Sequence, residues 1–293
     1  MQVSGLEVIS HRAVGTLAGP SIILVHAAWH AAWCWDEGFA ARLAAHGHNV
    51  HAVSLRGHGH SEGRRGLWRV RIRDHVADLR RVIDAVGGPV LLIGHSRGAY
   101  VVQKHLETAA AAGAVLLVPM PHFGVVPCMG RLLRRVPGAV ARIHASFGAF
   151  PIAATPAMAR ALFFSARMPE EAVRRHQARL QGEAFLAYLD PLGLDLCRPR
   201  WGASPMLVLG AGADALFTRR EMEEVAAAHG AGLEFVPGMA HDMMLKPGWE
   251  TVADRIAAWA QTIGACREEP RSGDIVRWAN EPVGGVEQAE ALS

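Results

Sequence analysis

The sequence has few cysteines and no long apolar segment. Its four cysteines, Cys34, Cys128, Cys197 and Cys266, are far apart and lack metal-ligand spacing, so we expect free thiols in a reducing compartment. No apolar run reaches the roughly 18 residues that a membrane-spanning helix requires. The stretch from Met1 to Ser4 lacks the basic and apolar regions of a secretion signal. These absences predict a cytoplasmic protein without a transmembrane segment.

Motifs for metals and nucleotides are also absent. The sequence contains no His-Glu-x-x-His, no Walker loop and no Gly-x-Gly-x-x-Gly behind an expected strand. Gly57-His58-Gly59 indicates a turn only. We therefore expect no metal, no cofactor and no nucleic-acid partner.

Acidic residues are missing from one long internal segment. Residues 108–169 contain no Asp or Glu but include Arg131, Arg134, Arg135, Arg142, Arg160 and Arg167. These six arginines give the segment more positive charge than the +3 of the whole chain, so the remaining residues together are net negative. The segment could attract an anionic substrate or make peripheral contact with anionic lipid. Alternatively, it packs against an acidic face of the core, or its arginines reflect genome composition.

Composition and periodicity describe a globular α/β protein. With 293 residues, of which 51% are hydrophobic, one large core with an insertion is expected rather than two equal domains. Strand and helix patterns alternate, which predicts a mostly parallel, twisted sheet with helices on both faces. Strands are expected at 3–9, 21–26, 49–54, 89–94, 114–118, 205–210 and 232–236, and helices at 35–46, 70–86, 97–112, 219–229 and 248–263.

The alternation stops between Pro119 and Trp201. We interpret 120–200 as a helical cap inserted into a core formed by 1–119 and 201–264. Short cap helices are expected at 129–146, 156–166, 169–182 and 183–190. The polar residues 265–293 offer few apolar anchors and predict a mobile C-terminal tail.

The most informative motif is Gly94-His95-Ser96-Arg97-Gly98, which lies between an apolar run and a helical pattern. A strand, a Gly-x-Ser-x-Gly turn and a helix form a nucleophile elbow, which lifts the serine Oγ above the edge of the sheet. Glycine is needed on either side because the turn brings two chain segments into near contact. Ser96 is therefore the candidate nucleophile.

A serine nucleophile needs a base, and the base needs an orienting acid. Asp214 follows the apolar run 205–209, and His241 follows the run 233–236, so each lies in a loop at the end of a strand. The order Ser96, Asp214, His241 differs from that of the chymotrypsin and subtilisin groups. Asp242 is a rival acid, but we expect a neighbour of the histidine to point elsewhere.

Backbone N–H donors for an oxyanion are expected at two places. One is Arg97, at the start of a helix. The other is the loop after residues 22–25, where Ala28 is the expected donor and Ala27 the alternative. The candidate pocket residues are Ala27, Trp29, His95, Phe163 and Phe164. Apolar residues of the cap are expected to cover an acyl pocket, namely Phe147, Phe150, Ile152, Met158, Leu162, Phe163, Phe164 and Met168.

Three segments resemble the α/β-hydrolase-fold serine hydrolases: residues 24–35, Leu55-Arg56-Gly57-His58-Gly59-His60-Ser61, and 241–245. The first is similar to the branch of plant methylesterases, hydroxynitrile lyases and bacterial esterases. That branch usually has glycine where this chain has Ala27 and Ala31. The resemblance covers residues 20–105 and 203–263. It implies the α/β-hydrolase fold and a Ser-His-Asp catalytic triad without a cofactor.

These residues predict a serine esterase that acts through an acyl-enzyme on a small-molecule ester with an apolar acyl group. A C–C bond hydrolase, thioesterase or lactonase would keep the same residues and stays open. A hydroxynitrile lyase is less expected, because that family places lysine after the catalytic histidine and this chain has Asp242. A ligand-binding receptor is also less expected, since the triad residues are all present. The sequence does not indicate an oligomeric state.

Overall fold

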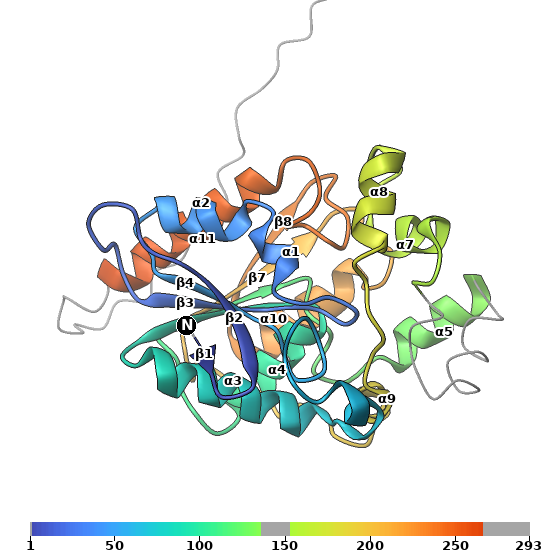
Figure 1. The fold of residues 1–293 in the computed structure, drawn as a ribbon, viewed down its shortest axis with the longest axis horizontal. Coiled ribbons are helices and arrows are strands. Elements are labelled where there is room, and N and C mark those ends of the chain that lie inside the picture. Colours follow the sequence, from blue (N-terminus) through green and yellow to red (C-terminus); the bar gives the residue numbers. More distant parts are fainter. Residues whose placement is uncertain (1, 136–152, 266–293) are drawn as a thin grey trace, which may run out of the picture.

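A mostly parallel sheet forms the middle layer of the protein (Figure 1). The computed structural model describes residues 2–135 and 153–265. Its eight described strands run in the order β1-β2-β4-β3-β5-β6-β7-β8. Six of them, β3 to β8, are parallel to one another, and β1 and β2 add an antiparallel edge. The strands are β1 (Gln2–Val3), β2 (Leu6–His11), β3 (Ser21–Val25), β4 (Val50–Val53), β5 (Val90–His95), β6 (Gly113–Leu117), β7 (Met206–Ala211) and β8 (Gly232–Val236).

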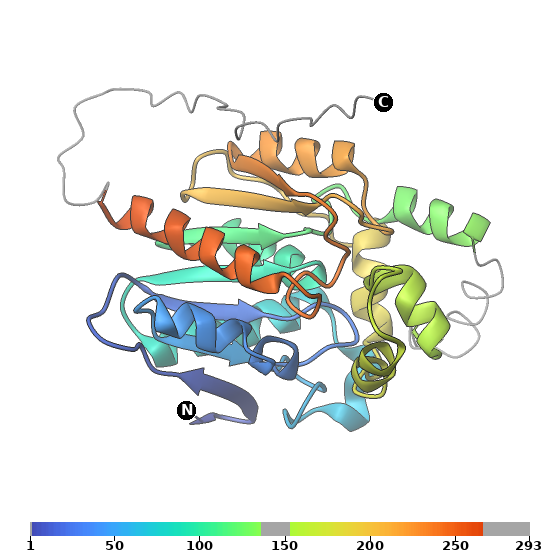
Figure 2. The same cartoon turned by 90° about the horizontal axis from the view of Figure 1, so that it is seen from above.

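Helices cover both faces of the sheet, as expected for buried parallel strands. Figures 1 and 2 show α2 and α11 on one face and α3, α4 and α10 on the other. The helices of the core are α1 (Trp33–Asp36), α2 (Phe39–Ala45), η1 (Arg64–Arg69), α3 (Ile72–Val86), α4 (Arg97–Leu106), α10 (Arg219–His229) and α11 (Trp249–Ala265). The predicted fold class is confirmed.

Some predicted elements are wrong in detail; the helix expected at 97–112, for example, ends at Leu106. The single strand expected at 3–9 is a hairpin of β1 and β2, which turns at Ser4 and Gly5 with Val3 opposite Leu6. Gly5 has a positive φ of 73°, which favours glycine at such a turn. The helix expected at 35–46 is split into α1 and α2 at Gly38, whose φ is 121°.

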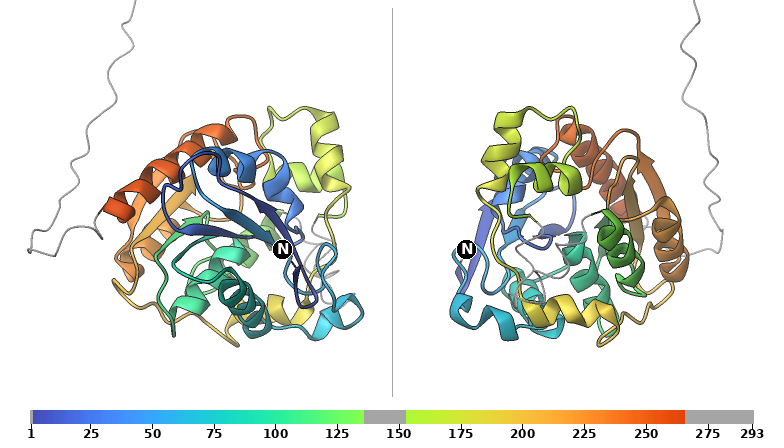
Figure 3. Two further views of the ribbon diagram at one scale, coloured as in Figure 1. Left: turned by 60° about the vertical axis from the view of Figure 1, so that its left-hand side comes forward. Right: turned by 90° about the vertical axis from the view of Figure 1, so that its right-hand side faces the viewer.

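A group of short helices lies between β6 and β7 in the sequence. These are α5 (Val126–Arg135), α7 (Pro156–Phe163), α8 (Glu170–Gln177), α9 (Phe185–Leu189) and η3 (Asp190–Leu192). Figures 2 and 3 place them beside the edge of the sheet toward which the parallel strands point. We call 120–200 the insertion; its boundaries as a cap domain stay a prediction.

Several predictions fall outside the described residues. They concern positions 136–146 of the helix expected at 129–146, the side chains of Arg142, Phe147, Phe150 and Ile152, and the tail from 266 onward. Within the described part, Arg131 pairs with Glu221 at 2.7 Å and Arg160 with Glu170 at 2.8 Å. Part of the positive charge of the insertion is therefore neutralised by acidic side chains. None of the described helices has the length and apolar character needed to cross a membrane.

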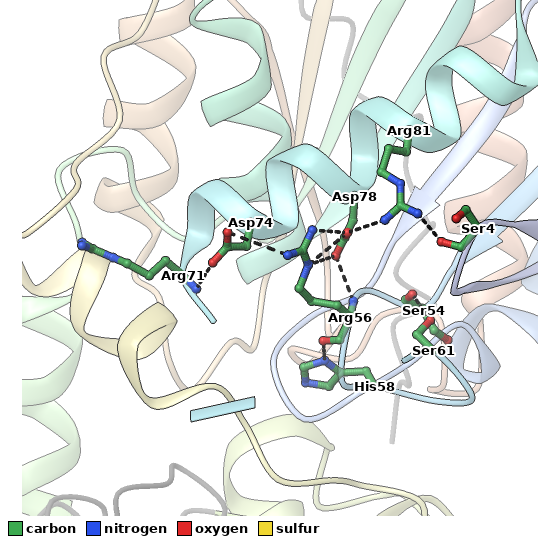
Figure 4. A network of polar contacts seen from close by, with 9 residues as sticks. All are labelled: Ser4, Ser54, Arg56, His58, Ser61, Arg71, Asp74, Asp78 and Arg81. Atoms are coloured by element: carbon green, nitrogen blue, oxygen red, sulfur yellow. Dashed lines mark hydrogen bonds and ion pairs between the residues drawn. The ribbon is translucent and has the colours of Figure 1, made fainter. Parts of the chain in front are cut away.

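The turn after β4 is anchored on α3 (Figure 4). Arg56 donates from Nε and Nη2 to the buried carboxylate of Asp78 at 2.9 and 2.7 Å, and its backbone N–H donates to the same group at 3.0 Å. His58 Nδ1 in turn donates to Arg56 O at 3.1 Å. These contacts fix His58 beneath the edge of the sheet where the site lies.

Candidate active site

Ser96 lies at the sharp turn between β5 and α4. Its φ of 51° and ψ of −112° are unusual for a residue other than glycine, so the surrounding structure must hold it there. A Cβ on Gly94 would lie 2.6 Å from Ala99 Cα, and one on Gly98 would lie 2.2 Å from Val25 O. These contacts explain both glycines, because the elbow packs backbone against backbone on either side of Ser96.

His241 and Asp214 are hydrogen-bonded. His241 Nδ1 donates to Asp214 Oδ2 at 2.8 Å. The other oxygen, Asp214 Oδ1, accepts from the N–H groups of Leu216 at 2.6 Å and Phe217 at 2.9 Å. These backbone bonds orient the carboxylate toward the ring. With Nδ1 occupied, Nε2 is the nitrogen of His241 that can accept a proton.

The charges around His241 favour its protonated form. Burial alone would lower the pKa of this histidine, but Asp214 outweighs it with help from Asp242, so the pKa is raised above its ordinary value. A raised pKa strengthens the ring as a proton acceptor.

Within the described residues, Ser96 Oγ and His241 make no hydrogen bond. The ring of His241 packs against Phe163, with centroids 6.0 Å apart, and against Phe217, at 5.7 Å. Hydrogen bonds between a catalytic nucleophile and its base are often long without substrate and tighten when substrate binds. The two side chains come from adjacent loops at the same edge of the sheet.

The loop after β3 carries hydrogen bonds on its backbone oxygens. His26 Nδ1 donates to Ala27 O at 2.7 Å, and His30 Nδ1 donates to Ala28 O at 2.8 Å. The N–H of Trp29 donates to Glu183 Oε2 at 2.9 Å. Among the described residues, neither Ala28 N–H nor Arg97 N–H has an acceptor. Both groups can therefore donate to a ligand.

Asp242 points away from the Nδ1 edge of His241. Its carboxylate is fully buried, and Oδ2 lies 3.0 Å from His30 Nε2. Its N–H donates to Phe163 O at 3.0 Å, which joins the histidine loop to the end of α7. Asp242 thus belongs to a packing network beside His241.

His95 supports the same loop from below. Its Nε2 donates to His241 O at 2.9 Å, and burial lowers its pKa to about 3, which keeps the ring neutral. In the described part of the chain, His95, His241 and Asp242 also form a group with potential metal ligands within 4.8 Å of one another. His95 Nε2 and His241 Nδ1 already donate to protein oxygens, so this arrangement fits a hydrogen-bond network better than a metal centre.

A mainly apolar cavity, partly open to solvent, adjoins Ser96. Ala28, Trp29, Arg97 and Phe163 contribute to its wall. Its apolar lining includes Met120, Val125, Cys128, Met129, Leu132 and Leu162.

Three residues predicted for the pocket do not line this cavity. Ala27 is buried behind the loop, and His95 lies under His241. The ring of Phe164 packs against His176 at 5.9 Å instead. Adjacent side chains in a loop or at the end of a helix point in different directions. Phe163 therefore reaches the cavity and Phe164 does not.

Glu183 is a further residue of the site, and no sequence pattern indicates it. This residue precedes α9, lines the cavity, and has only 2% of its side chain exposed. It forms an ion pair with the side chain of Arg97 and lies 3.3 Å from His58 Nε2. No local motif marks Glu183, because its partners are distant in the sequence and come together only in the fold.

Comparison with known proteins supports this architecture. The sequence model of the family described as "Alpha/beta hydrolase family" matches residues 22–255. A carbendazim-hydrolysing esterase from a Nocardioides species is 35% identical over 83 residues, which are 28% of this chain and 34% of that esterase. This match therefore spans about a third of the length of the curated relative.

Solved structures share the fold. A monoacylglycerol lipase from Paleococcus ferrophilus aligns with a TM-score of 0.63 and 19% identity, covering 88% of this chain and 99% of that one. A thermophilic esterase from Thermogutta terrifontis aligns with a TM-score of 0.66 and 20% identity, covering 88% and 94%. An esterase from Rhodococcus sp. ECU1013 aligns with a TM-score of 0.63 and 22% identity, covering 89% and 97%. Because the family match covers most of the chain, this protein belongs to the alpha/beta hydrolase family.

Proposed function

We propose that the protein is a serine hydrolase that cleaves carboxylic esters of small molecules. Ser96 is the nucleophile, His241 is the general base and acid, and Asp214 orients the imidazole. The N–H groups of Ala28 and Arg97 form the oxyanion hole. No cofactor takes part in this scheme.

Hydrolysis proceeds in two steps. His241 Nε2 removes the proton from Ser96 Oγ as the oxygen attacks the ester carbonyl, and the resulting oxyanion accepts hydrogen bonds from the two N–H groups. The tetrahedral intermediate collapses, and the alcohol leaves with the proton from His241. Water, deprotonated by the same ring, then cleaves the acyl-enzyme and restores the free hydroxyl.

The observation that carries this proposal is the arrangement at the sheet edge. A strained serine at the end of β5 adjoins a histidine whose Nδ1 is bonded to Asp214 at 2.8 Å. The apolar cavity beside Ser96 suits an acyl chain, because burial of its methylene groups is favourable. The esterases and lipases among the relatives agree with this reading.

The test is hydrolysis of p-nitrophenyl esters with acyl chains of increasing length by wild type and by Ser96→Ala. We expect the mutant to lose at least about a thousandfold in kcat. Ser10→Ala is the matched control, since Ser10 lies on β2, in the antiparallel edge of the sheet, whereas the site loops follow β3, β5, β7 and β8. Its side chain hydrogen-bonds His51 Nδ1 at 2.9 Å. If wild type and Ser96→Ala hydrolyse every ester equally, the proposal is wrong.

A further inference from the structure

The buried carboxylate of Glu183 joins the insertion to the loops of the site. Its Oε2 accepts from Trp29 N–H at 2.9 Å, and its Oε1 accepts from Ala184 N–H at 2.7 Å. Oε1 also forms the ion pair with Arg97, whose side chain is 2% exposed. A single group from the insertion thus contacts both the loop after β3 and the residue after Ser96.

Glu183 is ionised in this environment. Burial opposes the charge, but the nearby Arg97 and His58 outweigh burial and hold the pKa of the carboxyl well below its ordinary range. The carboxylate therefore acts as an acceptor only, which fits the N–H groups that face it.

The contact with Trp29 fixes one peptide group at both ends. The peptide between Ala28 and Trp29 has its oxygen bonded to His30 Nδ1 at 2.8 Å and its N–H bonded to Glu183 at 2.9 Å. Trp29 has a φ of 65°, an uncommon conformation for a side chain of this size. Surrounding contacts must over-determine such a conformation, and the bond to Glu183 is one of them.

The preceding peptide carries the Ala28 N–H group. Its oxygen, Ala27 O, is held by His26 Nδ1 at 2.7 Å, and His26 Nε2 accepts from Leu55 N–H at 3.0 Å. The direction of Ala28 N–H therefore depends on two consecutive peptides that are both held in place. Two residues of the insertion bond this loop: Glu183 accepts from Trp29 N–H, and the N–H of Gln181 donates to Trp29 O at 2.8 Å. Of these two, Glu183 also reaches Arg97.

We propose that Glu183 is a positioning residue for the oxyanion hole. By bonding Trp29 N–H and pairing with Arg97, its carboxylate fixes the spacing between the Ala28 and Arg97 N–H groups. This inference rests on the proposed function. It gives the insertion a role in the reaction itself, in addition to covering the cavity.

The variant Glu183→Gln tests the proposal. An amide has one oxygen and one NH₂ group, so it cannot accept from Trp29 N–H and also pair with Arg97 as the carboxylate does. Removal of one oxyanion donor lowers kcat by about 100- to 1000-fold in enzymes of this type, so a displaced hole should lower kcat by about 10- to 100-fold. KM should change by less than about threefold, because the misplaced N–H groups of the oxyanion hole stabilise the transition state more than the bound ester.

Asp190→Asn is a matched control. Asp190 is a second fully buried carboxylate of the insertion, and it too pairs with an arginine, Arg71, and accepts from a core N–H, that of Ile72 at 2.8 Å. In the described part of the chain, the hydrogen bonds and ion pair of this carboxylate go to Arg71 and Ile72 and not to the loop after β3. We expect both variants to lower the unfolding temperature, but only Glu183→Gln to lower kcat. Equal losses of kcat in the two variants, or a kcat for Glu183→Gln within about twofold of wild type, would overturn the proposal.

Amide hydrogen exchange gives a readout that does not depend on catalysis. A peptide that contains Trp29 should exchange faster in Glu183→Gln than in wild type or Asp190→Asn. If wild type shows no Ser96-dependent hydrolysis, the proposed function fails, and unchanged exchange at Trp29 would separately overturn the role of Glu183. Should Glu183→Gln not fold, Glu183→Asp serves instead, because it keeps the charge but cannot span Trp29 and Arg97.

Discussion

Replacing Gly98 with alanine would disturb the elbow by a predictable amount. The new Cβ would lie 2.2 Å from Val25 O and 2.5 Å from His26 O. Favourable contacts of a carbon begin near about 3.5 Å, so the start of α4 must move away from the end of β3 by about 1 Å. Both neighbours are backbone atoms, one at the end of β3 and one directly after it, so they cannot swing aside as a flexible side chain could.

This movement should affect both stability and rate. Overpacking of this kind costs about 1–3 kcal/mol or more in the free energy of unfolding. The same shift separates Ser96 and Arg97 N–H from the loop with Ala28, and a misplacement of about 1 Å lowers rates by about 100-fold. Urea unfolding and kcat/KM on the best p-nitrophenyl ester measure the two effects.

Gly130→Ala makes the same chemical change in a permissive place. Gly130 lies in α5, and a Cβ there meets no described atom outside the backbone of its own helix within 4 Å. Alanine in a helix is favoured over glycine by about 1 kcal/mol, so this variant should gain stability and keep its activity. If Gly98→Ala keeps wild-type stability and kcat/KM, then the close backbone packing assigned to the elbow is wrong.

Two further predictions concern the base and the cavity. Asp242→Asn removes a carboxylate that raises the pKa of His241, so the acidic limb of the pH profile of kcat/KM should move to lower pH. A limb that stays or moves to higher pH would refute this assignment. Leu132→Trp fills part of the cavity and should shift the preferred acyl chain to shorter esters. Its neighbour Leu133, which is 48% exposed, is the control, and the same shift in Leu133→Trp would contradict the assigned lining.

The sequence predicted the parts of the protein that local patterns specify. Apolar runs of four or five residues marked most of the central strands, because strands buried on both faces need continuous apolar sequence. The elbow was recognisable because glycine is required two positions before and two after Ser96. The contacts of Gly94 lie within the turn itself, and those of Gly98 are with the end of β3. The loops with Asp214 and His241 followed from their places at strand ends, and the structure brings these two side chains within 2.8 Å.

Contacts between distant segments could not be predicted in the same way. Glu183 and Trp29 are 154 positions apart in the sequence, and only the placement of the insertion over the sheet edge joins them. The direction of Phe164, away from the cavity, depends on how α7 ends against α8. The expected first strand is divided by a turn at Ser4 and Gly5. These two residues interrupt a sequence pattern that otherwise reads as one strand.

Covalent labelling tests the central claim most directly. The protein should be treated with an alkyl fluorophosphonate, which forms a stable adduct with activated serines, and the modified peptide identified by mass spectrometry. The account predicts one adduct on Ser96, with slower labelling in His241→Ala, because the ring activates the hydroxyl. Absence of labelling in the folded wild type, or an adduct on another serine with Ser96 unmodified, would contradict the assignment of Ser96 as the nucleophile.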